Sequence, residues 1–102
     1  MNKKILITLA FASLLSANDL DGKKVFETYC WGCHHQTAMA FGPPFSQIAA
    51  KRTKAEIKAY ITSPESMYKS FGYKRSVMTQ FHLSTQELNL VTDYILSYKG
   101  KK

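Results

Sequence analysis

The stretch Cys30-Trp31-Gly32-Cys33-His34 decides how this sequence is interpreted, because its spacing is that of covalent c-type haem attachment. Two thiols about one helical turn apart can add to the two vinyl groups on one side of a porphyrin. The next residue can then turn its imidazole under the ring, where a nitrogen coordinates iron. The motif therefore predicts one haem c, bound through Cys30 and Cys33, with His34 as an iron ligand.

Three other interpretations of the cysteine pair compete with haem attachment: a thioredoxin-type redox pair, a zinc site and a plain disulfide. An exported protein can join Cys30 and Cys33 in a plain disulfide. A thioredoxin-type redox motif needs a βαβ context, which this sequence lacks. A zinc site needs two further ligands at fixed spacing, and His34 and His35 are too close together to form a second pair. These are the only two cysteines, which excludes a scaffold held by several disulfides.

The residues before the motif predict a secretory signal peptide over residues 1–17. Asn2-Lys3-Lys4 forms a positively charged start, residues 5–15 are an uncharged and mostly apolar run, and Ala17 is a small residue at the expected cleavage point. No apolar run reaches the roughly 18 residues that suggest a membrane-spanning helix. We therefore expect a periplasmic protein in which residues 18–102 form one domain.

The composition is that of a small, basic, globular chain. Its 102 residues are 45% hydrophobic and 21% charged, which makes disorder of the whole chain improbable. Without residues 1–17, 85 residues remain with a net charge of +5. A core of that size is marginal, so a porphyrin would help to fill it. The charge suits an acidic protein partner or transient contact with an anionic membrane surface, and the alternative is that the lysines simply keep a small protein soluble. Export argues against nucleic acid.

The patterns on either side of the motif predict an all-α fold of three to four helices wrapped around the haem. The first helix leads into Cys30, with Asp19 or Asp21 as its cap. Capping boxes that begin at Thr53 and Ser84 start two more helices, and Pro64 ends the first of these. The last helix carries one apolar stripe and is expected to end near Gly100; the stripe consists of Leu88, Val91, Tyr94, Ile95 and Tyr98.

Residues 37–51 and 66–80 lack a helical period and are expected to be irregular. The first of these segments contains Gly42-Pro43-Pro44, which cannot continue a helix. The second contains two methionines and Gly72. Five aromatic residues from the two segments and their flanks are suitable walls for a haem pocket: Phe41, Phe45, Tyr68, Phe71 and Phe81.

Over essentially all of residues 18–102, the chain resembles the class I (monohaem) cytochrome c family. The resemblance implies that the N- and C-terminal helices cross where Gly22 meets Tyr94. It implies that the Pro43 carbonyl accepts the Nδ1 proton of His34. It also implies that Met78, in Val77-Met78-Thr79-Gln80-Phe81, is the second axial ligand. One departure is Thr79, because the family usually has proline after this methionine.

Other side chains compete with Met78 for the distal position. His82 is a rival because it lies close to Met78, and Met67 lies in the same broad region. Met39 follows the attachment site too closely to reach across the ring, so we expect it to fill the core. His35 is expected to face solvent. Met78 is favoured because it lies 44 residues after His34 and six before the last helix begins, which allows the chain to wrap around a porphyrin.

Iron held by both His34 and Met78 has no open position for a substrate, so no catalytic residue is assigned and no enzyme activity is expected. The resemblance implies a monomeric one-electron carrier. Its expected partners are redox proteins such as a quinol–cytochrome c reductase, a terminal oxidase or a periplasmic reductase. Two alternatives remain: a ligand-binding or sensing haem protein in which Thr79 leaves Met78 labile, or an exported disulfide module without haem.

Overall fold

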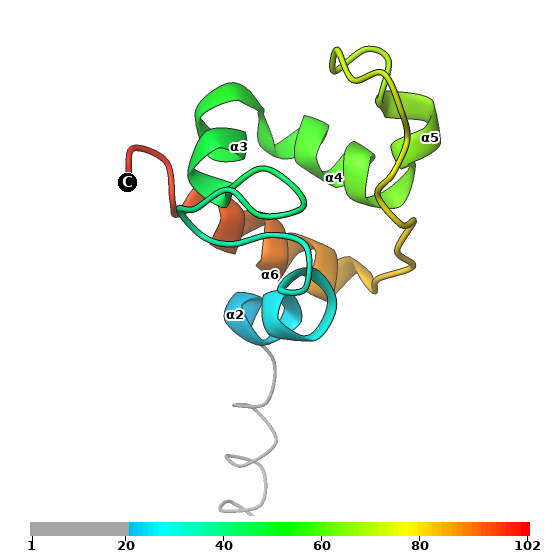
Figure 1. Ribbon diagram of the computed structural model, residues 1–102. Coiled ribbons are helices and arrows are strands. Elements are labelled where there is room, and N and C mark those ends of the chain that lie inside the picture. The colour runs from blue at the N-terminus through cyan, green and yellow to red at the C-terminus, as the bar shows by residue number, and fades with distance from the viewer. Residues whose placement is uncertain (1–20) are drawn as a thin grey trace, which may run out of the picture.

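Five α-helices and one π-helical turn form the regular structure of residues 21–102, the part of the chain that the computed structural model describes. In chain order they are α2 (Gly22–Val25), the π turn η1 (Phe26–Cys30), α3 (Phe45–Lys51), α4 (Lys54–Thr62), α5 (Pro64–Met67) and α6 (Thr85–Leu96) (Figure 1). No strand occurs within residues 21–102, which confirms the all-α class. The predicted signal peptide, residues 1–17, lies outside the described residues.

The first and last helices cross at Gly22, as the resemblance implied. Asp21 caps α2 by accepting a hydrogen bond from the Lys24 backbone N–H at 2.8 Å. A Cβ atom on Gly22 would lie 2.7 Å from the Tyr94 Cβ and would also collide with the Leu90 carbonyl oxygen. The two helices therefore approach so closely that only glycine fits, and Figure 1 shows α2 lying against α6.

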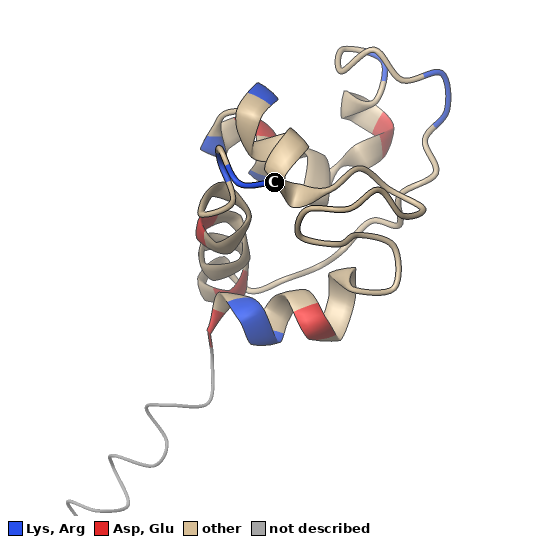
Figure 2. Ribbon diagram, turned by 60° about the vertical axis from the view of Figure 1, so that its left-hand side comes forward, with Lys and Arg blue, Asp and Glu red and all other residues tan. Residues whose placement is uncertain are grey.

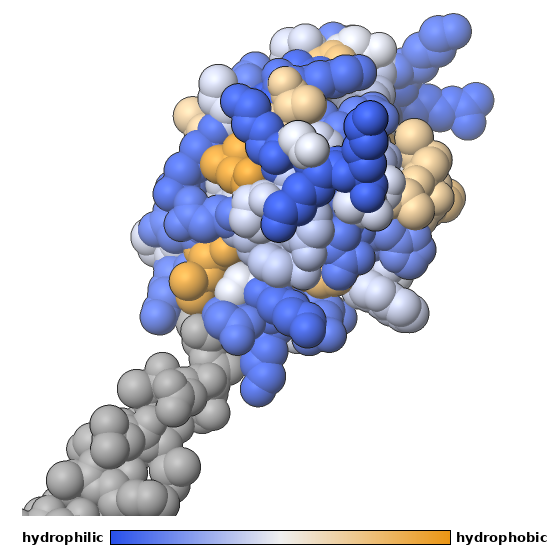
Figure 3. Space-filling model, turned by 90° about the vertical axis from the view of Figure 1, so that its left-hand side faces the viewer, coloured by the Kyte–Doolittle hydropathy of each residue, from blue (hydrophilic) through white to orange (hydrophobic). Residues whose placement is uncertain are grey.

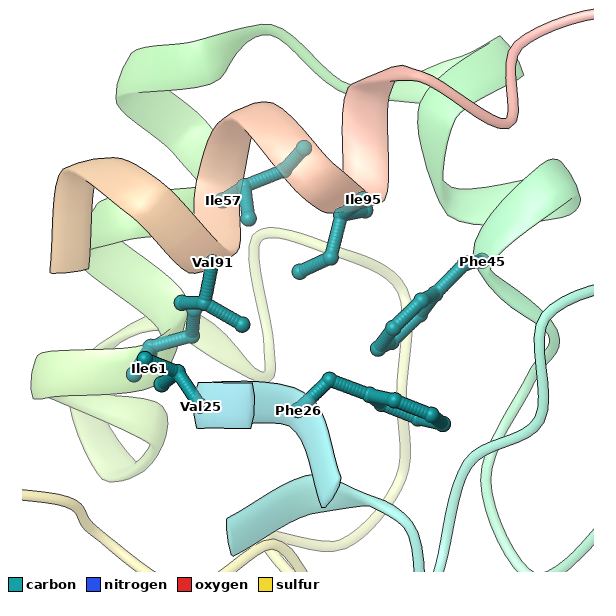
Figure 4. Close-up of a cluster of buried hydrophobic side chains, with 7 residues drawn as sticks. All are labelled: Val25, Phe26, Phe45, Ile57, Ile61, Val91 and Ile95. Carbon is teal, nitrogen blue, oxygen red and sulfur yellow. The ribbon is translucent and has the colours of Figure 1, made fainter. Parts of the chain in front are cut away.

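The core forms where four helical segments meet. Its buried side chains come from α2 and η1 (Val25, Phe26), α3 (Phe45), α4 (Ile57, Ile61) and α6 (Val91, Ile95) (Figure 4). The Phe26 and Phe45 rings meet edge to face with centroids 5.1 Å apart. This small core holds α6 between the N-terminal segment and α3–α4, so the loops that connect these helices are left to build the site.

Both predicted capping boxes are present. The Thr53 hydroxyl accepts from the Glu56 N–H at 3.2 Å and starts α4, and the Ser84 hydroxyl accepts from the Glu87 N–H at 3.1 Å and starts α6. The last helix is shorter than predicted. α6 ends at Leu96, four residues before Gly100, and the chain continues as short turns. Gly100 itself adopts a positive φ of 80° beyond them.

Two short helices were not predicted, and they raise the number above the three to four expected. α3 begins immediately after Pro44, inside a segment that the sequence suggested was irregular. Its first N–H groups donate to carbonyl oxygens of the preceding loop, Phe45 N to His35 O and Ser46 N to Gln36 O, both at 3.0 Å. Pro64 ends α4 as predicted but also opens α5, because proline suits the first helical turn.

The face shown in Figure 3 is mostly hydrophilic, with hydrophobic residues in separate patches. In the described part of the chain, no helix has the length and apolar character needed to cross a membrane.

Candidate cofactor site

A cavity of about 470 Å³ opens between the loop after η1, the helices α3 and α4, and the segment after α5. Cys30, Cys33, His34, Pro43 and Met78, the five residues singled out from the sequence, all line it. The fold therefore brings together the cysteine motif and a methionine 44 residues further along the chain.

The motif forms a helix-like turn, and its Cys30, Cys33 and His34 residues line the cavity. The Cys33 and His34 N–H groups both donate to the Cys30 carbonyl, at 3.1 and 2.9 Å. Both cysteines are free thiols. Burial, together with the neighbouring Cys33, raises the pKa of the Cys30 thiol to about 11. A dithiol redox motif needs a lowered thiol pKa, so Cys30 does not resemble a reactive redox cysteine.

The His34 ring is held in one orientation. Its Nδ1 lies 2.7 Å from the Pro43 carbonyl oxygen, the contact that the resemblance implied. Because a carbonyl can only accept, Nδ1 carries the proton and Nε2 keeps a free lone pair. Phe45 stacks on the ring with centroids 5.7 Å apart. A Cβ on Gly42 would collide with the imidazole, lying 2.8 Å from its Nδ1, so this loop position admits only glycine without a shift.

Met78 is half-buried, lines the cavity and packs against the core cluster. Its rivals lie elsewhere: neither Met67 nor the exposed His82 lines the cavity. The expectation that Met39 fills the core was wrong, because its side chain is 66% exposed. The prediction for His35 was also only partly right, because its ring is half-buried beside Trp31, although it too lies outside the cavity.

Aromatic rings form much of the cavity wall. Phe41, Phe45, Phe71 and Phe81 line it as predicted. Tyr68 does not; it lies beside Lys69, whose Nζ is 5.9 Å from the ring centroid. Three tyrosines that were not predicted from the sequence also line the cavity: Tyr29, Tyr60 and Tyr73.

Tyr60 joins two of these walls. Its ring lies 4.8 Å from that of Phe71 and 6.0 Å from that of Tyr73, measured between centroids. Burial, and to a smaller extent Tyr73, raise the pKa of the Tyr60 phenol. Ile57 and Ile61 of the same helix also line the cavity, so Tyr60 lies on the face that α4 turns towards it.

Four cationic residues and no acidic ones line the cavity: Lys51, Arg52, Lys74 and Arg75. Arg52 is half-buried and donates from Nη2 to the Phe71 carbonyl at 3.0 Å, with its guanidinium carbon 3.8 Å from the Phe71 ring centroid. These residues were not identified from the sequence, although two Lys-Arg pairs, one just before α4 and one in the segment after α5, were a visible signal. In Figure 2, the charged residues on the loop after α5 are all basic.

The residues present fit a covalently attached haem. Two thiols, an imidazole with a free Nε2 and a thioether share one largely apolar cavity, and the basic side chains can neutralise the two propionate carboxylates that a haem carries. Within residues 21–102, no three His, Cys, Asp or Glu side chains cluster to hold a bare metal ion. The donor set suits an iron already held by a porphyrin.

Comparison with known proteins agrees with this fit. The family model for cytochrome c matches residues 20–99, which include every residue that lines the cavity. No match was found among curated proteins or among solved structures.

Proposed function

Because the chain belongs to the cytochrome c family, whose members bind haem and generally carry electrons, we propose that it is a one-electron carrier with a single haem c attached to Cys30 and Cys33. When bound, the haem supplies a one-electron redox couple at its iron. The observation that carries the proposal is that both thiols, the His34 imidazole and the Met78 thioether line the same cavity.

His34 is the proximal ligand in this proposal, through Nε2. The hydrogen bond from its Nδ1 to the Pro43 carbonyl, 2.7 Å long, orients the ring and makes the imidazole a stronger donor. Phe45 restricts rotation of the same ring by stacking on it. These contacts restrict the orientation of the His34 ring.

Met78 is the distal ligand. A thioether is a soft donor that raises the reduction potential, and the aromatic walls add to this by limiting access of water. With His34 and Met78 both in place, no position is left for a substrate. The arrangement therefore favours electron transfer over catalysis.

The opening of the cavity is the proposed docking face. Phe41 and Val77 line the cavity yet are 76% and 65% exposed, so they lie at its rim. Lys51, Lys74 and Arg75 are exposed on the same lining. An apolar rim with surrounding positive charge suits an acidic redox partner, such as a quinol–cytochrome c reductase, a terminal oxidase or a periplasmic reductase. Residues 1–17 direct export in this proposal, and the carrier works as a monomer in the periplasm.

Met78→Ala in the haem-loaded protein tests the ligand set. The variant should keep its haem, because both thioether bonds to the porphyrin remain. It should lose the thioether-to-iron charge-transfer band, have a lower reduction potential and bind carbon monoxide when reduced. Met67→Ala and Met39→Ala are matched controls that should leave the band unchanged. A band that survives Met78→Ala and disappears in Met67→Ala would show the assignment to be wrong.

A further inference from the structure

The segment that carries Met78 is held at its N-terminal end by Arg52. The chain leaves α5 through turns closed by hydrogen bonds from Phe71 N to Met67 O and from Tyr73 N to Tyr68 O, at 3.1 and 2.9 Å. Arg52 then binds the Phe71 carbonyl and lies over the Phe71 ring. This end of the segment is thus attached to the residue that follows α3.

Between these turns and Gln80, packing of the Met78 side chain against the core holds the segment, and hydrogen bonds do not. Within residues 21–102, no hydrogen bond involves residues 74–79, and the Ser76 hydroxyl is buried without a partner. Thr79 leaves the backbone after Met78 free to rotate in φ, whereas a proline would restrict it. Local backbone structure therefore does not determine where the Met78 sulfur lies.

The C-terminal end of the segment binds the end of α4. The Gln80 side-chain Nε2 donates to the Thr62 carbonyl at 2.9 Å, and the Phe81 backbone N–H donates to the Ile61 carbonyl at 3.3 Å. Both carbonyls belong to the last turn of α4, where the carbonyl oxygens have no N–H donors within the helix itself. Gln80 is only two residues after Met78, so its hydrogen bond is the attachment closest to Met78 along the chain.

We propose that Gln80 is the positioning residue for the distal ligand: its amide holds the chain after Met78 on α4 and so keeps the thioether at the cavity. The inference rests on the proposed ligation by Met78. Gln80 is exposed and does not line the cavity, so it acts on the ligand only through the backbone. Release of this bond lets the segment move away more often, and an added ligand then competes more successfully for the iron.

Cyanide affinity of the oxidised holoprotein measures this displacement. Gln80→Leu removes the donor and should raise the affinity about threefold, the value of one exposed hydrogen bond. Gln80→Glu keeps the size but places a carboxylate against the negative end of α4, and should raise it about tenfold. Gln86→Glu, at an exposed position on α6, makes the same change in charge and should have no effect.

Asp21→Ala provides a second control, because it removes the α2 cap and lowers global stability without removing any hydrogen bond of the Met78 segment. It should leave cyanide affinity unchanged. If it raises the affinity as much as Gln80→Leu does, or if neither Gln80 variant differs from the unmodified protein while the thioether band is present, Gln80 does not position Met78. If the unmodified protein lacks the thioether band, Met78 ligation fails and this inference fails with it.

Discussion

At the scale of single residues, the site depends on how closely the Gly42-Pro43 pair approaches His34. The Pro43 carbonyl fixes the protonated nitrogen of the ring, and Gly42 leaves the space that the ring occupies. The resemblance was sufficient to predict the hydrogen bond between His34 and Pro43, because this bond needs only one backbone carbonyl close in sequence to the cysteine motif. The close approach of Gly42 to the His34 ring was not predicted, because it depends on a distance in the folded structure that no sequence pattern shows.

Gly42→Ala should disturb the His34 ring, whereas Gly32→Ala should not. A Cβ at position 42 would collide with the imidazole, whereas one at position 32 meets nothing within 4 Å. We expect Gly42→Ala to lower the free energy of unfolding of the holoprotein by about 1–3 kcal/mol and to shift its reduction potential. Denaturant unfolding and redox titration of both variants check this. Equal potentials in the two variants would contradict the role given to Gly42.

At the scale of elements, the helix starts that were predicted carry local signals, and the helix α3 that was missed depends on contacts with the preceding loop. The capping boxes of α4 and α6 lie within four consecutive residues each, so the sequence displays them. α3 is only seven residues long, too short for a clear period, and its first N–H groups are satisfied by carbonyls of His35 and Gln36. Those contacts exist only after the loop has folded back, so the helix was not predicted.

The crossing of α2 and α6 can be tested with Gly22→Ala. The added methyl group would collide with Tyr94 and the Leu90 carbonyl, so the helices must separate. We expect a loss of about 1–3 kcal/mol in the free energy of unfolding of the holoprotein, measured by urea denaturation followed by circular dichroism. Lys23→Ala, on the exposed side of the same helix, should change stability by less than about 0.5 kcal/mol. Similar losses in both variants would mean that the crossing is not tight.

At the scale of the whole molecule, the cavity is large for so small a core. Seven side chains form the buried cluster, and the neighbouring cavity of about 470 Å³ has mostly apolar walls. Without a covalent cofactor these walls would face water, which weakens the hydrophobic stabilisation of the fold. Haem attachment is therefore expected to be a condition of folding as well as of function.

The double variant Cys30→Ala/Cys33→Ala should accordingly carry no covalent haem and be largely unfolded at 25 °C. Circular dichroism and extraction of haem with acidified solvent check both parts. Trp31→Ala is the matched control, because this exposed residue lies in the same motif but outside the cavity and should leave both properties intact. A helical, cooperatively unfolding, haem-free double variant would show that the protein core is sufficient on its own.

The positive cavity rim should govern encounter with a partner. Lys74→Glu/Arg75→Glu should slow oxidation of the reduced protein by a terminal oxidase about tenfold at low ionic strength, and the difference should shrink as salt screens the charges. Lys23→Glu/Lys24→Glu changes net charge equally on α2, away from the cavity, and should have a smaller effect. Stopped-flow rates over a range of salt concentrations decide this. Equal slowing by the two variants would mean that net charge alone matters.

The sequence by itself determined the all-α class, the cysteine motif with its histidine, the capped starts of α4 and α6, and Met78 as the leading distal candidate. The cysteine motif and the capped helix starts are carried by short runs of residues whose chemistry acts locally, whereas Met78 was favoured by the resemblance and by its spacing from His34. The tertiary structure alone decided which aromatic rings face the cavity, that Met39 is exposed, that four cations gather at the site, and that Gln80 reaches Thr62. These depend on distances between segments remote in the chain, which the packing of α2, α3 and α4 against α6 sets.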